Sequence, residues 1–525
     1  MCQLILTISS IYQTVATIRE IAAREHIRYA FDFHSPWHLG NENDRVFIPR
    51  KHNETIKSEM RFANLFERAI TPKALPYSAA HTFPADFSWN SSNTSCFGNY
   101  MYWTAGAELA FTLETPYFDV SGRPFNQEGA RETGRCFAKA LSQYHTRSAK
   151  LSFTGDILYQ MPMNDLCKTG DTYDFKPLLS KIEPRLADAD YLVGNVESPF
   201  AGEENEGYTH ERYCFNTPEQ ALEALKESGF DVVTLANNHC MDRGQAGMLA
   251  TLDACERAGL KHMGVYRTTA ERRKVFVEEV RGIRVGFVNA TYGTNAFAHH
   301  KFLDNDKKFM VRLTQPEETL EGAIDLLQPL EDIAAETDRL YSPTQESVRI
   351  YLGGLKNDVQ TAKQKAEFVV VLLHSGGQYN VVPDAYTEML TKKLREYGAD
   401  LIVVNHPHII LPSSYEGAYF IAYCLGNLVS MEPGSAISSL VNPDFSAIVN
   451  LYLQRDATGK VEHHVSFKLC QLFFDAPEKP PYVVDTYDQW CSNPTEEYAN
   501  LILEYANRFA PGKGYSSPQA EYLIF

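Results

Sequence analysis

The sequence lacks a Cys-x-x-Cys pair, a basic charge balance and a long apolar run, and each absence excludes a class of protein. The ten cysteines are scattered, so they offer neither a paired zinc site nor a redox motif, and a reducing compartment is expected. A formal charge of -17 argues against a general nucleic-acid binder, because neutralising phosphates requires a basic face.

The membrane and export signals are also missing. No stretch reaches the roughly 18 apolar residues that cross a bilayer, so we expect no transmembrane segment. The first residues have neither a basic n-region nor a small-residue cleavage site, so they do not resemble a signal peptide. As written, the sequence therefore predicts a cytoplasmic protein, and an extracytoplasmic one if the N-terminus is incomplete.

The length and composition indicate a folded protein of more than one domain. A chain of 525 residues is too long for one ordinary core. Its 44% hydrophobic and 22% charged residues are typical of globular domains. We expect one domain over residues 1–146, a second over 148–475, and a C-terminal linker and helix over 476–525.

From residue 151 onward, short apolar runs alternate with helix-like segments. This alternation is the signature of an α/β domain whose helices cover a largely parallel sheet. Ligands of such folds bind at the carboxyl ends of the strands. The expected strands are LSFTGDI (151–157), DYLVGNVE (190–197), FDVVTLANNH (230–239), GIRVGFVNA (282–290), EFVVVLLHSGG (367–377) and ADLIVVNHPHI (399–409).

Polar residues of metal-ligand type stand where five of these runs stop. Any one of them alone would more often be a helix cap or a satisfied core histidine. Their occurrence together, at consecutive strand ends, instead indicates a functional site. They are Asp156, Asn195, Glu197, Asn237, Asn238, His239, His374, His406 and His408.

Carboxylate, carboxamide and imidazole ligands suit manganese, iron or zinc, whereas a softer site would use cysteine. Two such ions about 3.5 to 4 Å apart polarise a phosphoryl oxygen and generate a hydroxide nucleophile near neutral pH. This chemistry needs a bridging carboxylate and a proton donor for the leaving group. A histidine beside a ligand asparagine, such as His239, has the right chemistry for the donor.

These motifs resemble, in order, the successive blocks of CapA-type poly-gamma-glutamate capsule synthesis proteins. The blocks include FTGDI, GNVESP and LLHSGGQY, and the match covers roughly residues 148–430. The most specific are the Ala-Asn-Asn-His block with its trailing Asp242 and Gly244, and the His-Pro-His block followed by Leu-Gly-Asn. The resemblance implies a calcineurin-like metallophosphoesterase α/β sandwich with two divalent ions. It also implies an anionic polymer or phosphoester substrate, such as poly-gamma-glutamate, and the capsule synthesis machinery as partner.

The resemblance also assigns roles. Asp156 and His408 would bind one ion, and Glu197, or Asn195 beside it, would bridge. Asn238, His374 and His406 would bind the second ion, and whether Asn237 or Asn238 faces the metal stays open. The remaining roles are proton donation or phosphate contact by His239 and substrate binding by Asn237 and Asn295.

Three positions depart from the pattern. Leu158 stands where the superfamily usually has a metal histidine, so the first site has fewer protein ligands. Ser375 and Gln378 replace an aromatic residue and an acid that usually follow the histidine equivalent to His374. These changes favour weaker binding at the first site or an altered substrate.

The first 146 residues resemble the later half of zinc carboxypeptidases. In YAFDFH a strand ends in His34, like a zinc ligand, and in AELAFTLE another ends in Glu114, like the general base. None of the sixteen histidines has Glu three positions later, so the His-x-x-Glu ligands are missing and the zinc site is incomplete. The alternatives are a truncated or mis-started reading frame, a degenerate remnant, or a site completed by another chain. As written, we predict no peptidase activity.

Three functions follow from these observations. The preferred one is a metal-dependent hydrolase of capsule or poly-gamma-glutamate metabolism with water as nucleophile. The second is a non-catalytic factor for capsule assembly or polymer binding, which Leu158 and Gln378 favour. The third is a metallocarboxypeptidase fusion whose start is missing.

Overall fold

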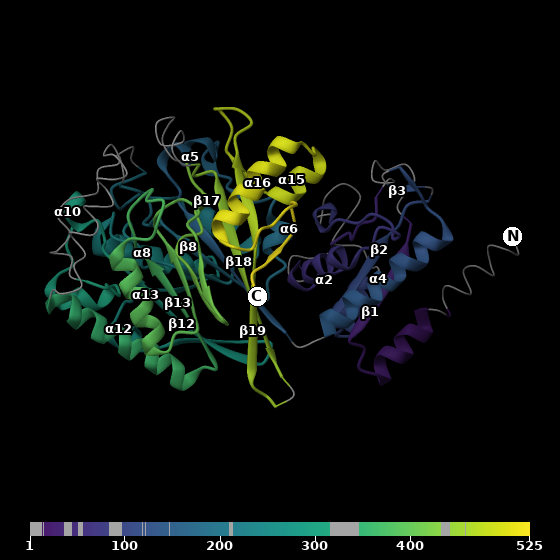
Figure 1. Ribbon diagram of the computed structural model, residues 1–525, viewed down its shortest axis with the longest axis horizontal. Coiled ribbons are helices and arrows are strands. Elements are labelled where there is room, and N and C mark those ends of the chain that lie inside the picture. The colour runs from purple at the N-terminus through teal and green to yellow at the C-terminus, as the bar shows by residue number, and fades with distance from the viewer. Residues whose placement is uncertain are drawn as a thin grey trace, which may run out of the picture. The chain divides into compact units, whose positions relative to one another are not determined.

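The computed structural model divides into two compact units, residues Met1–Thr146 and Arg147–Phe525 (Figure 1). No described helix is long and apolar enough to cross a membrane. The described residues are 13, 15–35, 45–50, 56–82, 97–117, 119–120, 122–145, 148–208, 214–315, 346–431, 442–456 and 458–525.

The first unit is built on two parallel strands, β1 (Tyr29–His34) and β2 (Leu109–Glu114). Helices α2 (Ile56–Ala69) and α4 (Gln127–His145) pack against each other beside them. Phe31, Phe62, Phe111 and Phe137 form an aromatic cluster with ring centroids 4.7 to 6.2 Å apart. The smaller elements are η2 (Ala79–His81), α3 (Phe97–Asn99), η3 (Tyr100–Thr104), β3 (Asp119–Val120) and β4 (Arg123–Pro124).

The second unit contains a nine-stranded sheet in the order β10-β9-β8-β5-β18-β19-β20, with β17 beside β5 and β21 beside β19. Strands β10, β9, β8 and β5 run parallel, and β18 to β21 extend the sheet by antiparallel pairing. The strands are β5 (Ala149–Ile157), β8 (Tyr191–Val196), β9 (Val232–Thr234), β10 (Lys261–Met263), β17 (Asn427–Val429), β18 (Phe445–Arg455), β19 (Val461–Phe473), β20 (Tyr482–Asp485) and β21 (Tyr522–Leu523).

A six-stranded sheet has the order β11-β12-β13-β14-β16-β15, and its four central strands are parallel. Alternate side chains of one strand lie in different cores, as the pleat requires. In β13, Phe368 and Val370 belong to the core between the sheets, whereas Val369 and Val371 pack under helices. The strands are β11 (Phe276–Val280), β12 (Ile283–Thr291), β13 (Phe368–His374), β14 (Leu401–Asn405), β15 (Ser414–Glu416) and β16 (Tyr419–Ala422).

The two sheets pack face to face, and helices cover both outer faces of the pair (Figure 1). Helices α5 (Met161–Leu166), α6 (Glu183–Leu186), α7 (Gln220–Glu227) and α8 (Gly244–Arg257) cover the nine-stranded sheet. Helices α12 (Glu346–Lys365) and α13 (Ala385–Tyr397) cover the six-stranded sheet. Helix α16 (Glu496–Phe509), which follows α15 (Thr486–Ser492), adds Ile502 and Phe509 to the core between the sheets.

Local signals set where these elements end. Asp384 caps α13 by accepting a hydrogen bond from the Thr387 amide, and Gly398 ends the helix with a left-handed φ of 109°. The remaining short elements are β6 (Lys168–Thr169), β7 (Thr172–Tyr173), η4 (Lys176–Leu178), α9 (Thr269–Arg272), α10 (Ala296–His299) and η5 (Asn305–Met310).

The prediction of an α/β fold is confirmed. The expected strands correspond to β5, β8, β9, β12, β13 and β14. They lie in two sheets rather than one, and the antiparallel strands near the C-terminus extend the larger sheet. Residues 476–525, which we assigned to a C-terminal linker and helix, contribute β20, α15, α16 and β21 to this unit.

Candidate metal centre

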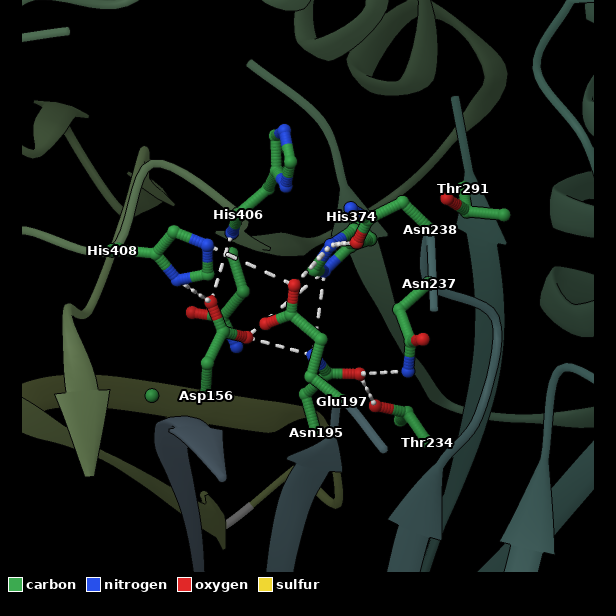
Figure 2. A network of polar contacts seen from close by, with 12 residues as sticks. Asp156, Asn195, Glu197, Thr234, Asn237, Asn238, Thr291, His374, His406 and His408 are labelled. Atoms are coloured by element: carbon green, nitrogen blue, oxygen red, sulfur yellow. Dashed lines mark hydrogen bonds and ion pairs between the residues drawn. The ribbon is translucent and has the colours of Figure 1, made fainter. Parts of the chain in front are cut away.

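The carboxyl ends of strands from both sheets meet at one buried cluster of carboxylates and imidazoles (Figure 2). Asp156 lies near the end of β5 and Glu197 directly follows β8, both in the larger sheet. His374 ends β13, and His406 follows β14 in the smaller sheet. These four side chains are at most 1% exposed. Charged and imidazole groups buried this deeply need partners or a metal ion.

Glu197 belongs to two sets of side chains that are close enough to hold a cation. One set joins Glu197 to His374 and His406, and the other joins it to Asp156 and His408, with the ligand atoms of each set within 4.8 Å of one another. Glu197 Oε1 lies 3.3 Å from His374 Nε2 and 3.8 Å from His408 Nε2. Figure 2 shows Glu197 between these two rings. Glu197 is therefore the residue that the two sets have in common.

Neighbouring amides orient the cluster. Asn195, which pairs with Asp156 in the sheet register, donates a 2.7 Å hydrogen bond from Nδ2 to Asp156 Oδ1. Its Oδ1 accepts from Thr234 Oγ1 at 3.0 Å. Asn195 therefore supports Asp156, whereas Glu197 is the residue that both sets share.

The two adjacent asparagines point in different directions. Asn238 Oδ1 lies 2.7 Å from His374 Nε2, at the cluster. Asn237 instead donates from Nδ2 to the Val196 carbonyl at 2.7 Å and faces Asn195. Of the two alternatives left open by the sequence, Asn238 is the one whose oxygen faces the histidines.

The His-Pro-His segment has a strained backbone. His406 and His408 have φ values of 117° and 62°, in a region that non-glycine residues seldom occupy. The His406 amide donates to Asp156 Oδ2 at 3.1 Å. His408 Nδ1 lies 3.5 Å from the same carboxylate and 2.9 Å from Asn427 Oδ1. Such strain persists at functional sites where the surroundings fix the geometry.

His406 provides a test of whether this site fits a metal. Its side chain is 0% exposed, and neither ring nitrogen has a hydrogen-bond partner among the residues that the structure describes. The ring packs against Tyr292 and His374 with centroids 4.7 and 4.8 Å away. A buried imidazole without hydrogen bonds is costly, and coordination of a cation together with Glu197 and His374 would satisfy one nitrogen. The residues therefore fit a divalent metal.

Burial and charge set the protonation of these groups. Burial lowers the pKa of His374 to about 3, although Asp156 opposes the shift. Burial and the neighbouring histidines hold the pKa of His406 well below its usual value. Burial raises the pKa of Asp156, but the hydrogen bond from His408 and the charges of His374 and His408 leave it below its usual value. Neutral imidazoles and an ionised carboxylate are the forms that bind metals.

His239 lies beside the cluster, and Asp242 and Phe215 contact its ring. Its Nδ1 is 2.8 Å from Asp242 Oδ2, and its ring packs on Phe215 at 4.4 Å. Asn295 links the two regions, because its Oδ1 accepts from Asn238 Nδ2 at 3.3 Å and its Nδ2 lies 3.5 Å from His239 Nδ1. Asn295 has a left-handed φ of 53°. The structure thus brings Asn295 and His239 next to the candidate ligands.

Several contacts were missed by sequence reasoning. Asn427, the partner of His408, belongs to the Leu-Gly-Asn motif that carried part of the resemblance, so its position was a usable signal. Asp242, three residues after His239, contacts that ring through its carboxylate. Leu158 has an apolar side chain and therefore supplies no metal ligand. This residue is 3% exposed, and its amide donates to the Val429 carbonyl.

The two residues singled out in the first unit lie side by side on paired strands. His34 is the register partner of Glu114 in the β1–β2 ladder. The His34 side chain is 63% exposed, and Asp32 Oδ2 lies 3.8 Å from its Nδ1. Among the described residues, neither His34 nor Glu114 belongs to a set of three metal-ligand side chains.

The fold and this buried carboxylate and histidine centre define an α/β protein with a candidate metal site, and comparison with known proteins identifies its family. The model of the family described as bacterial capsule synthesis protein PGA_cap matches residues 150–432. This match covers more than half of the chain, so the chain belongs to that family.

Two curated relatives match over much of the chain. The capsule biosynthesis protein CapA of Bacillus anthracis is 28% identical over 291 residues, which cover 54% of this chain and 61% of the relative. The PGA biosynthesis protein CapA of Bacillus subtilis (strain 168) is 25% identical over 331 residues, or 63% of this chain and 74% of the relative. The chain thus spans less than two thirds of the B. anthracis protein.

A crystal structure of a hypothetical protein from Thermus thermophilus matches 64% of this chain and 99% of its own chain at 16% identity. The TM-score of that match is 0.27, so the structural similarity is weak.

Proposed function

We propose that this protein is a metal-dependent hydrolase of capsule or poly-gamma-glutamate metabolism, with a calcineurin-like metallophosphoesterase site in its second unit. The observation that carries the proposal is the position of Glu197, shared by two buried sets of ligand side chains. The names of the two Bacillus relatives support the link to capsule synthesis.

Each set would hold one ion. Asp156, Glu197 and His408 would form the first site, and Glu197, Asn238, His374 and His406 the second. Manganese, iron or zinc suits these ligands. When bound, such a pair of ions supplies electrophilic activation of the substrate and a water nucleophile that ionises near neutral pH.

The other residues would manage the substrate and the proton. His239 would donate a proton to the leaving group, because Asp242 holds its Nδ1 and leaves Nε2 as the available ring nitrogen. Asn295 would contact the substrate beside it, in keeping with its contacts to Asn238 and His239. Asn237 faces Asn195 and Val196, which favours a supporting role over substrate binding.

A second candidate is a non-catalytic factor that binds the polymer or assists capsule assembly. Leu158 favours it, because this buried side chain leaves the first set with only three ligands from the chain. A weakly held ion at that site would preserve the fold and lower turnover. Gln378, in place of the usual acid, supports the same alternative.

For the first unit we propose a carboxypeptidase-like segment without activity. The adjacent His34 and Glu114 support the likeness. A catalytic zinc needs three protein ligands, and His34 supplies one. A peptidase fusion would require the missing ligands from residues or chains beyond those described.

The proposed hydrolase is tested by assaying the metal-reconstituted full chain on a generic phosphodiester and on poly-gamma-glutamate. We expect turnover that falls about 100-fold or more in His239→Ala, because general acid catalysis typically contributes 10²–10⁴-fold. His300→Asn serves as the control and should keep its activity, because this histidine is exposed and asparagine tolerates its left-handed φ of 51°. Equal rates in wild type and His239→Ala would exclude the catalytic role and favour the binding factor.

A further inference from the structure

A second group of potential metal ligands lies behind His239. Cys214, Asp242 and His299 come from three separate segments, namely the stretch before α7, the turn before α8 and the last residue of α10. Their ligand atoms all lie within 4.8 Å of one another. Cys214 and Asp242 are buried, and His299 is 12% exposed. The group contains sulfur, unlike the centre around Glu197.

One oxygen of the buried Asp242 carboxylate accepts no hydrogen bond from the described residues. Its Oδ2 accepts a 2.7 Å hydrogen bond from the Phe215 amide and contacts His239 Nδ1. Its Oδ1 accepts no hydrogen bond among the described residues, although the side chain is 0% exposed. That oxygen lies 3.5 Å from His299 Nε2, a separation compatible with two ligands of one tetrahedral ion.

Charged side chains of both signs surround this group of three residues. Arg243 Nη1 donates to the Cys214 sulfur at 3.4 Å, and the Cys214 thiol donates to the Asp242 carbonyl at 3.3 Å. Arg243 and Lys301 are both paired with Glu206, at 3.1 and 2.7 Å. With Cys214 ionised, three negative side chains face two positive ones.

We propose that Cys214, Asp242 and His299 form a separate binding site for a zinc-type ion. Cysteine, histidine and carboxylate are all zinc ligands, and a site of three protein ligands leaves a fourth position for water. Binding releases the Cys214 thiol proton to solvent. The ion would fix Asp242 and, through its other oxygen, the orientation of His239, and it would tie the three segments together.

Cobalt(II) titration of the metal-free full chain tests this site without relying on enzyme activity. A thiolate bound to cobalt gives a near-ultraviolet charge-transfer band, and the proposed ligands around Glu197 include no sulfur. We expect the band in wild type, its loss in Cys214→Ser and its retention in Cys255→Ser, a buried cysteine of α8. Absence of the band in wild type at saturating cobalt overturns the proposal, as does its persistence in Cys214→Ser.

A second variant separates ligation from folding. His299→Ala keeps the thiol but removes one ligand, so we expect the band to need at least tenfold more cobalt. His300→Asn, at its exposed neighbour with a left-handed φ of 51°, should titrate like wild type. Equal titration of His299→Ala and wild type contradicts the site. His406→Ala should leave the band unchanged even if the hydrolase proposal fails, so the two proposals fail independently.

Discussion

The buried histidines should make the metal-free protein lose stability as the pH falls below about 6.5. His374 is 1% exposed and its pKa is lowered to about 3 by burial. The folded state therefore keeps this ring neutral, while the unfolded chain takes up a proton near pH 6.5. The stabilising contribution is complete above the unfolded pKa and declines steadily as the pH approaches 3.

The size of the effect follows from proton linkage. With an unfolded pKa of 6.5, one such histidine removes about 1.2 kcal/mol of unfolding free energy between pH 6 and pH 5. Burial raises the pKa of Asp358 to about 6 and that of Asp485 to about 7, so carboxylates also titrate near this window. The difference between wild type and a His374 variant isolates the contribution of the imidazole.

The assay is chemical denaturation of chelator-treated protein at pH 6 and pH 5, comparing wild type with His374→Gln. The variant should lose about 1.2 kcal/mol less than wild type over this interval, whatever its starting stability. His300→Asn is the control, because this residue is exposed and asparagine tolerates its left-handed φ of 51°. An equal loss in wild type and His374→Gln would refute the reasoning.

Three further predictions concern packing and metal binding. Gly155→Ala should lower the free energy of unfolding by at least about 2 kcal/mol, because a Cβ there would lie 2.1 Å from the Gly426 carbonyl oxygen. The substitution should also weaken metal binding, because residue 155 precedes Asp156. Gly353→Ala is the control, because a Cβ on this residue of α12 would meet open space. It should stabilise the protein by roughly 0.5–1 kcal/mol. Thermal melts of the two variants and wild type measure both effects. Saturation to 100 times the dissociation constant should add about 2.7 kcal/mol per site, so an unchanged melting temperature after chelation would contradict metal binding. His34→Ala should not change the zinc content measured by elemental analysis, since an exposed lone histidine binds zinc weakly, and a lost zinc ion would indicate a working site in the first unit.

Strand alternation and terminal polar residues were enough to predict the α/β class and the grouping of the candidate ligands. Each of the six expected strands is a short apolar run, and the parallel register brings their ends together. The sequence did not determine whether Asn195 or Glu197 faces the histidines, and the direction of their side chains distinguishes the two. Asn195 lies within β8 and bonds Asp156, whereas Glu197 follows the strand and lies between the histidines.

Other features depend on tertiary contacts that local patterns do not encode. The division into two sheets and the antiparallel extension by β18 to β21 require pairing between distant segments. The left-handed φ values of His406 and His408 follow from no local pattern in the sequence. Cys214 and His299 are 85 positions apart in the printed sequence, and no spacing motif relates them to Asp242.

The most direct test of the central claim is the metal content of the reconstituted full chain. The measurement is best made on Cys214→Ser, which removes the proposed sulfur-containing site, after incubation with manganese, iron or zinc and removal of free ions. We expect two ions per chain, and close to none when Glu197→Gln is added, because that carboxylate belongs to both ligand sets. Finding no bound ion in Cys214→Ser, or the same number with and without Glu197→Gln, would contradict a dinuclear centre.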